Sequence, residues 1–145
     1  MSALFGIGLY RAKTRDNIGG VVRSLGCFGG SFLYLEGIRY TQQVTDCMKM
    51  TRQFPVSYVP DLLEAAPHSC VPVAVEVSGK TSLPRFTHPP NAYYIFGPED
   101  GSLGDELLRR CPYSVVIPTK FCLNLASATT VVLYDRIAKG EDSNG

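Results

Sequence analysis

Two loops in the last third of the chain constrain its fold most, because each follows a short apolar segment and precedes a helix-like one. The first loop occupies residues 97–104 and follows the apolar residues 92–96. The second occupies residues 118–122 and follows the apolar residues 113–117. Parallel strands need a crossover segment between them, so strands that alternate with helices predict a mostly parallel sheet. We therefore expect an α/β fold in which helices flank the sheet.

The rest of the chain continues this alternation less regularly. The β-branched run at residues 71–77 predicts a strand. Further strands are expected at residues 4–10, 31–35 and 55–59. Helices are expected at residues 17–27, 62–66, 102–110 and 123–138, with a less clear one at 41–52.

Helix ends are indicated by capping residues. Asp16 is expected to cap the first helix, and the pair Gly29 and Gly30 to end it. Ser102, followed by an acid three residues later, is expected to open the helix 102–110. Residues 79–91 hold three prolines and predict a loop.

Length and composition favour one globular domain. The chain has 145 residues, of which 45% are hydrophobic, so it can bury a core without a disulfide or metal. We expect a single domain over residues 1–139 and a polar tail over residues 140–145. The sequence has no apolar run of membrane-spanning length and no secretory signal pattern at its start. The net charge of +1 argues against nucleic-acid binding by bulk charge but allows a local basic patch.

The cysteines and histidines do not indicate a metal site. The five cysteines are widely spaced and form no CxxC pair, and the two histidines lie in proline-flanked loops. We expect reduced, mostly buried thiols in a cytoplasmic protein without a metal. The cysteines are Cys27, Cys47, Cys70, Cys111 and Cys122.

The last expected helix, residues 123–138, is apolar on nearly every face. A helix of this kind is buried on most sides, and a small domain has few places to bury one except a subunit interface. We therefore expect a homodimer. The alternative is a central core helix in a monomer.

The loop 97–104 has features of a ligand site. Gly97 and Gly101 allow a ligand to approach the backbone closely, and the loop follows the carboxyl end of a strand, where open α/β sheets bind ligands. The glycine patterns of phosphate-binding loops are absent. Glu99 and Asp100 would oppose phosphate and suit a neutral or cationic ligand such as a sulfonium. Alternatively, the loop is an ordinary turn.

Asn17 and Arg23 lie six residues apart near the start of the first expected helix. Asn17 could be a capping residue and Arg23 a solvated cation. Alternatively, the guanidinium of Arg23 could bind a ribose–phosphate backbone.

Three segments together resemble the motifs of the SpoU/TrmH branch of the SPOUT superfamily. They are residues 16–23, residues 96–103, and residues 117–119 with 123–126. The resemblance extends from about Leu4 to Arg136. It implies a C-terminal deep trefoil knot, S-adenosylmethionine as cofactor, and methylation of ribose 2′-hydroxyls in RNA. In that reaction the 2′-oxygen would attack the sulfonium methyl directly.

The resemblance also implies roles for individual residues. The family pattern differs at Cys122, where serine is usual, and the segment from Pro118 to Cys122 is short. Arg23 would position phosphate and stabilise the developing alkoxide, with a role as base as the alternative. The implied catalytic residues are Arg23, Asn17, Glu99 and Asn124. The implied cofactor-binding residues are Phe96, Gly97, Gly101, Ile117, Cys122 and Leu125.

The resemblance favours a tRNA substrate, because the minimal members that methylate the tRNA wobble ribose likewise lack an added RNA-binding domain. Alternatives are an rRNA 2′-O-methyltransferase, a non-catalytic cofactor- or RNA-binding module, and an unrelated nucleotide-binding regulator. Partners would be RNA and a second copy of the chain, without membrane or metal. Arg11, Lys13, Arg15 and Lys120 could join Arg23 in an RNA-facing patch, or could be scattered surface cations.

Overall fold

The computed structural model describes residues 3–38 and 54–144, with side chains as far as residue 140. Its strands form one seven-stranded sheet in which every pairing is parallel. The strands are β1 (Phe5–Tyr10), β2 (Phe32–Glu36), β3 (Val56–Tyr58), β4 (Val71–Val75), β5 (Thr81–Ser82), β6 (Ala92–Phe96) and β7 (Tyr113–Val116). Their order across the sheet is β3-β2-β1-β6-β4-β7-β5.

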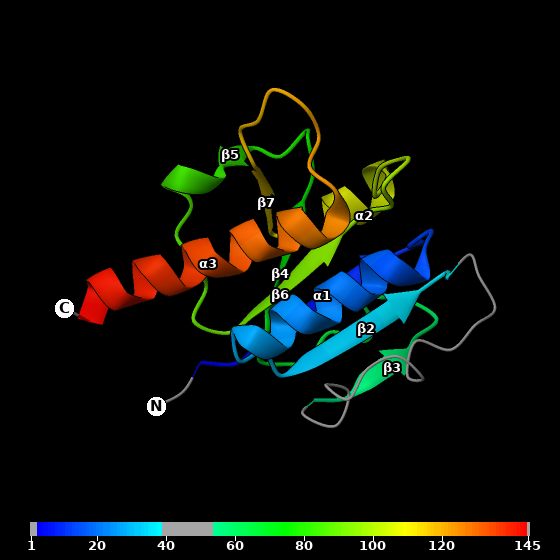
Figure 1. The fold of residues 1–145 in the computed structure, drawn as a ribbon, viewed down its shortest axis with the longest axis horizontal. Coiled ribbons are helices and arrows are strands. Elements are labelled where there is room, and N and C mark those ends of the chain that lie inside the picture. The colour runs from blue at the N-terminus through cyan, green and yellow to red at the C-terminus, as the bar shows by residue number, and fades with distance from the viewer. Residues whose placement is uncertain (1–2, 39–53, 145) are drawn as a thin grey trace.

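Helices cover both faces of the sheet, as Figure 1 shows. The helices are α1 (Arg15–Cys27), α2 (Asp105–Arg110) and α3 (Leu125–Asn144), and η3 (Leu83–Arg85) is a short 3-10 turn. Helices α1 and α3 lie side by side on one face, and α2 packs on the other. The expected α/β fold with a mostly parallel sheet is confirmed. The trefoil knot stays a prediction from the resemblance.

Several element boundaries differ from expectation. Thr14, not Asp16, caps α1, because the Thr14 hydroxyl accepts a hydrogen bond of 3.3 Å from the backbone N–H of Asn17. Helix α2 starts at Asp105 after Gly104, so Ser102 lies outside it. Residues 62–66 form turns instead of the expected helix, because a segment this short before Pro67 cannot offset the cost of helix nucleation.

Two further segments are more ordered than expected. Residues 79–91, expected as a loop, include β5 and the turn η3. Helix α3 runs to Asn144, into the segment expected as a polar tail. The helix expected at residues 41–52 lies outside the described residues.

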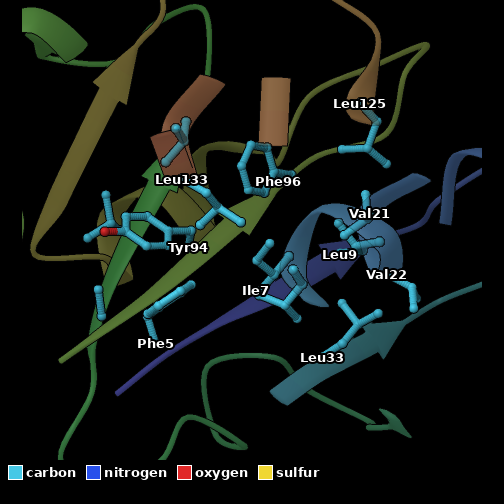
Figure 2. Close-up of a cluster of buried hydrophobic side chains, with 14 of the residues drawn as sticks. Phe5, Ile7, Leu9, Val21, Val22, Leu33, Tyr94, Phe96, Leu125 and Leu133 are labelled. Atoms are coloured by element: carbon cyan, nitrogen blue, oxygen red, sulfur yellow. The ribbon is translucent and has the colours of Figure 1, made fainter. Parts of the chain in front are cut away.

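Strand β6 is the centre of the core because it is buried on both faces. Ala92, Tyr94 and Phe96 face α1 and α3, whereas Tyr93 and Ile95 face α2, as the period of two in a strand requires. Figure 2 shows the hydrophobic cluster on the face of the sheet covered by α1 and α3, where Tyr94 and Phe96 meet side chains from β1, α1 and α3.

Helices α1 and α3 approach each other closely, and a glycine allows this. A Cβ atom added to Gly20 would lie 2.5 Å from the Cβ of Ala126. One turn further along, the hydroxyls of Ser24 and Thr130 form a hydrogen bond of 2.5 Å. The N-terminal part of α3 is therefore held firmly against α1, which matters because this part borders the site described below.

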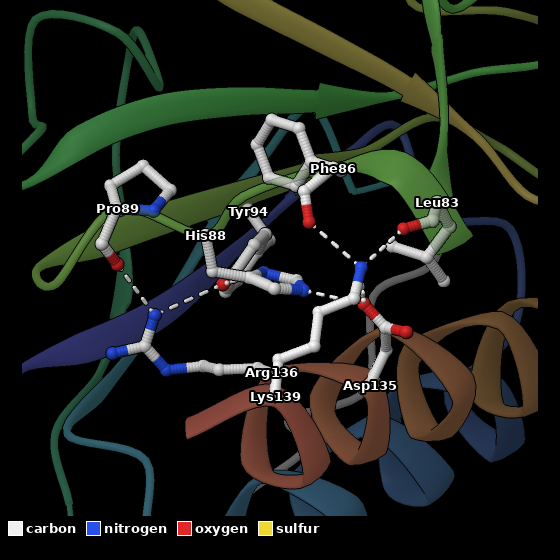
Figure 3. Close-up of polar contacts among 8 residues, drawn as sticks. All are labelled: Leu83, Phe86, His88, Pro89, Tyr94, Asp135, Arg136 and Lys139. Atoms are coloured by element: carbon white, nitrogen blue, oxygen red, sulfur yellow. Dashed lines mark hydrogen bonds and ion pairs between the residues drawn. The ribbon is translucent and has the colours of Figure 1, made fainter. Parts of the chain in front are cut away.

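A polar network holds the C-terminal half of α3 against residues 83–90 (Figure 3). Arg136 donates to the Pro89 carbonyl at 2.7 Å and to the Tyr94 hydroxyl at 3.1 Å. Lys139 donates to the carbonyls of Leu83 and Phe86 at 2.6 and 2.7 Å. The network therefore ties α3 to η3, to the loop after η3 and to β6.

His88 lies at the centre of this network and is almost completely buried. Its Nδ1 lies 2.7 Å from the Tyr94 hydroxyl, and its Nε2 lies 2.7 Å from Asp135. Because Arg136 donates to the Tyr94 oxygen, the Tyr94 hydroxyl can donate to Nδ1, and Nε2–H then donates to Asp135. Burial lowers the pKa of His88, against the opposing effect of Asp135, and burial raises the pKa of Tyr94 to about 12.

Candidate functional site

A pocket opens where the carboxyl ends of β6, β4 and β7 lie side by side. Helix α3 begins at the same edge, and its residues Leu125 and Ala128 form part of the wall. This is the end of a parallel sheet at which ligands bind in open α/β folds. The other lining residues are Val75, Glu76, Val77, Phe96, Gly97, Pro98, Glu99, Gly101, Val116, Ile117, Thr119, Cys122 and Leu123.

All six residues expected to bind the cofactor line this pocket. Phe96, Gly97 and Gly101 come from the end of β6 and its loop, and Ile117, Cys122 and Leu125 come from the segment between β7 and α3. Gly97 is the most constrained of them. A Cβ atom there would lie 3.1 Å from the Leu103 nitrogen and 3.2 Å from the Ser102 carbonyl carbon, so the loop folds back directly over it.

Glu99 connects the loop after β6 to the start of α1. Its Oε1 accepts a hydrogen bond of 2.7 Å from the Asn17 side chain, and its Oε2 accepts one of 3.2 Å from the Lys13 backbone. The Lys13 ammonium also lies 3.9 Å from Asp100, but both groups are exposed, so this pair contributes little stability. The structure thus brings together two of the four expected catalytic residues.

Asn124 is the N-cap of α3. Its Oδ1 accepts a hydrogen bond of 2.8 Å from the Ser127 backbone, and its carbonyl accepts one of 2.9 Å from Ala128. In the sequence, Asn124 stands between Leu123 and Leu125, and both of these residues line the pocket. Asn124 therefore fixes the direction in which α3 leaves the pocket.

Arg23 is exposed on α1 and is not among the residues that line the pocket. It forms no hydrogen bond or ion pair with any residue that the structure describes. Its guanidinium is therefore available to a ligand, although the structure does not place it beside Glu99 or Asn17. Arg11, Lys13 and Arg15 lie on the loop that follows β1 and on the start of α1, and Lys120 lies on the loop before α3.

Glu76 and Thr119 also line the pocket, although the sequence patterns did not predict this. The strand expected at residues 71–77 ends at Val75, so Glu76 lies at the strand end and not inside the strand. The sequence does contain a signal for Glu76, because this acidic residue interrupts the β-branched run of residues 71–77 close to the end of the expected strand.

The charge of the pocket restricts its ligands. Glu76 and Glu99 are its two ionisable carboxylates, and no lysine, arginine or histidine lines it. Apolar side chains such as Val75, Ile117 and Leu125 form much of the remaining wall. The arrangement suits a partly apolar ligand with a positive charge and disfavours one that carries phosphates. Within the described ranges, no group of three or more histidine, cysteine or acidic residues could hold a metal ion.

The described cysteines are free thiols, but they are not mostly buried. Cys70 is buried and Cys111 is half-buried, whereas Cys27 and Cys122 are exposed. The expectation of mostly buried thiols was therefore wrong, because both exposed cysteines lie near helix ends at the surface. Burial raises the pKa of Cys111 to about 11. Cys47 lies outside the described residues.

The comparison with protein families decides the classification. A model of the SpoU rRNA methylase family matches residues 5–134. The chain belongs to the SpoU rRNA methylase family. This confirms the resemblance drawn from the three sequence motifs. No curated protein matches the chain significantly by sequence.

Solved structures of SpoU-type proteins share the fold. A structure that concerns 2-OH methylation of C/U34 on tRNA is 24% identical, with a TM-score of 0.80, over 97% of this chain and 93% of that one. AviRb from Streptomyces viridochromogenes, a SpoU methyltransferase in complex with AdoMet, is 23% identical, with a TM-score of 0.84, over 97% of this chain and 59% of its own. The TrmH/SpoU tRNA modifying enzyme of A. aeolicus is 18% identical, with a TM-score of 0.80, over 97% of this chain and 77% of that one.

None of the helices in the described parts of the chain has the length and apolar character needed to cross a membrane.

Proposed function

We propose that this protein is an S-adenosylmethionine-dependent RNA methyltransferase that acts on ribose 2′-hydroxyls. The observation that carries the proposal is the pocket at the carboxyl ends of β4, β6 and β7, in a chain of the SpoU rRNA methylase family. When bound, S-adenosylmethionine supplies an electrophilic methyl group.

The pocket fits this cofactor. Its two carboxylates and lack of lining cations match the positive charge of a sulfonium, and its apolar walls match an adenosine. The backbone around Gly97 and Ile117, with Phe96, Gly101, Cys122 and Leu125, would hold the adenosine part. Gly97 supports this assignment, because a Cβ atom there would lie 3.1–3.2 Å from backbone atoms of Leu103 and Ser102, which would have to shift by a few tenths of an ångström.

The chain's other site residues would serve the RNA. Glu99 holds the cofactor loop against α1 through Asn17, which would keep the two sides of the site in register. Arg23, exposed on α1, would bind a phosphate of the RNA and stabilise negative charge on the reacting oxygen. Asn124 would contact the substrate from the start of α3. Arg11, Lys13, Arg15 and Lys120 would extend the RNA-facing surface.

A tRNA substrate is the form of this function that we favour. The chain matches nearly the full length of the structure that concerns methylation of C/U34 on tRNA, whereas it spans only 59% of AviRb. An rRNA substrate is the alternative within the same chemistry.

We also propose that the protein is a homodimer that uses α3. Large apolar side chains remain exposed on α3 and on the loop just before it. Val131 and Tyr134 on α3, and Phe121 and Leu123 on the loop, are between 38% and 80% exposed. Val131 and Tyr134 line an apolar groove with Leu83, Pro84, Pro118 and Ala138. Ile117 lines both this groove and the pocket, so a partner seated in the groove would border the cofactor site.

The test is methyl transfer from S-adenosylmethionine to unmodified total RNA, read as 2′-O-methylated nucleosides by mass spectrometry. The wild-type protein is expected to methylate RNA, and Arg23→Ala is expected to lose at least about tenfold in rate while still binding S-adenosylhomocysteine. Arg109→Ala is the matched control, because Arg109 is also an exposed helical arginine but lies on α2. If Arg23→Ala transferred methyl groups as fast as wild type, the proposed RNA site would be wrong.

A second candidate function is a cofactor- or RNA-binding module without transfer activity. Cys122 favours it, because an exposed thiol in the pocket is a weaker hydrogen-bond partner than the serine usual in the family. Binding of S-adenosylhomocysteine without any methyl transfer to total RNA would support this alternative.

A further inference from the structure

Glu76 directly follows β4, which lies between the other two strands whose ends form the pocket, β6 and β7. Its backbone N–H donates a hydrogen bond of 3.0 Å to the Val115 carbonyl on β7. Its backbone is therefore held between two strand ends, and the residue itself lines the pocket.

The side chain of Glu76 reaches the loop that follows the third strand, β6. Its Oε2 accepts a hydrogen bond of 2.9 Å from the Leu103 backbone, and its Oε1 accepts one of 3.2 Å from the Val77 backbone. A carboxylate that accepts from a backbone amide makes a charge-assisted hydrogen bond, one of the stronger kinds. The loop is thus fixed at two points, by Glu99 near its middle and by Glu76 at its end.

The position of Leu103 determines the shape of the pocket. A Cβ atom added to Gly97 would lie only 3.1 Å from the Leu103 nitrogen, so the two ends of the loop 97–104 lie close together. The side chain of Leu103 is buried in the core under α2, and the Gly104 cap of that helix supplies no side-chain hydrogen bond. Gly104 donates a 3.2 Å hydrogen bond to Ser102 within the same loop, whereas the contact with Glu76 ties this end of the loop to the end of β4.

We propose that Glu76 is a positioning residue of the cofactor site. Its carboxylate holds Leu103 so that the loop 97–104 closes over Gly97 and keeps the pocket in its binding shape. The inference rests on the proposed function, because it assigns S-adenosylmethionine to this pocket. Glu76 acts through the loop and not on the reacting atoms, so it should affect cofactor affinity more than the rate at saturation.

Two substitutions separate position from charge. Glu76→Ala removes the acceptor, whereas Glu76→Gln removes the charge but keeps an oxygen that can accept from Leu103. Calorimetric titration with S-adenosylhomocysteine is expected to give a Kd about tenfold higher for Glu76→Ala and within about threefold of wild type for Glu76→Gln. In methyl transfer, Glu76→Ala should raise KM for S-adenosylmethionine with a smaller effect on kcat. Glu64→Ala is the matched control, since Glu64 is exposed and does not line the pocket.

Amide hydrogen exchange tests the same link without any ligand. The Leu103 amide is expected to be protected in wild type and Glu76→Gln and to exchange faster in Glu76→Ala. Unchanged exchange and affinity in Glu76→Ala would overturn the proposal. An equal loss of affinity in both variants would also overturn it, because S-adenosylhomocysteine carries no sulfonium charge and the oxygen kept in Glu76→Gln should still hold Leu103. If wild type failed to bind S-adenosylhomocysteine while Leu103 exchange still rose in Glu76→Ala, the proposed function would fall but the anchoring of the loop would stand.

Discussion

The interaction between α3 and residues 83–90 should contribute strongly to stability, and Arg136 is the residue to test. Its guanidinium donates to the carbonyls of Pro89 and Pro90 and to the hydroxyl of Tyr94, and it lies 4.8 Å from the centre of the Phe5 ring. Arg136→Met would keep most of the apolar stem and remove all three hydrogen bonds.

The size of the effect follows from these contacts. A hydrogen bond to a charged group contributes about 1.5–3 kcal/mol. The contacts with Pro89 and Tyr94 are partly buried, whereas the one with Pro90 is exposed and counts little. Two bonds at the lower value predict that the free energy of unfolding falls by about 3 kcal/mol. For a chain of this size, that corresponds to a fall in Tm of about 6–12 °C.

Urea unfolding of Arg136→Met, followed by circular dichroism, would measure this change. Arg136→Lys should recover only part of the stability, because an ammonium cannot reach all three acceptors in the geometry of a guanidinium. Arg109→Met is the control for loss of a cation, since Arg109 is exposed. A loss below about 0.5 kcal/mol in Arg136→Met, typical of an ordinary surface substitution, would refute the reasoning.

Two further predictions concern pH and the cofactor loop. Burial lowers the pKa of His88 in the folded protein, so at mildly acidic pH the unfolded chain binds more protons than the folded one. The contribution of His88 to the free energy of unfolding should therefore be fully present above about pH 6.5 and be lost as the pH falls below that value. Thermal unfolding across this range should show the fall in wild type, and a similar slope in His88→Gln would contradict it. Gly97→Ala should weaken S-adenosylhomocysteine binding by about tenfold, because the added methyl would lie 3.1–3.2 Å from backbone atoms of residues 102 and 103 and would shift this part of the loop. Gly140→Ala is its control, because an added Cβ atom at Gly140 meets nothing within 4 Å and Gly140 does not line the pocket, and equal binding by both variants would count against the assigned loop.

Local sequence patterns predicted the architecture of this protein well. The apolar segment 92–96 coincides with β6, and the loops that follow β6 and β7 both reach the pocket. These signals are readable because side-chain alternation, β-branched runs and glycine positions depend on short stretches of chain. The same patterns were less reliable for short elements such as residues 62–66, where capping and packing outweigh propensity.

The sequence by itself determined that the chain forms an α/β sheet and which loops border the site, because both depend on residues close together in the chain. Only the tertiary structure decided which side chains meet there. Asn17 contacts Glu99 across 82 positions, and Glu76 contacts Leu103 across 27. Which strands become neighbours is set by packing of the whole core, so no local pattern could show that Glu76 anchors a loop from another strand or that Arg23 lies outside the pocket lining.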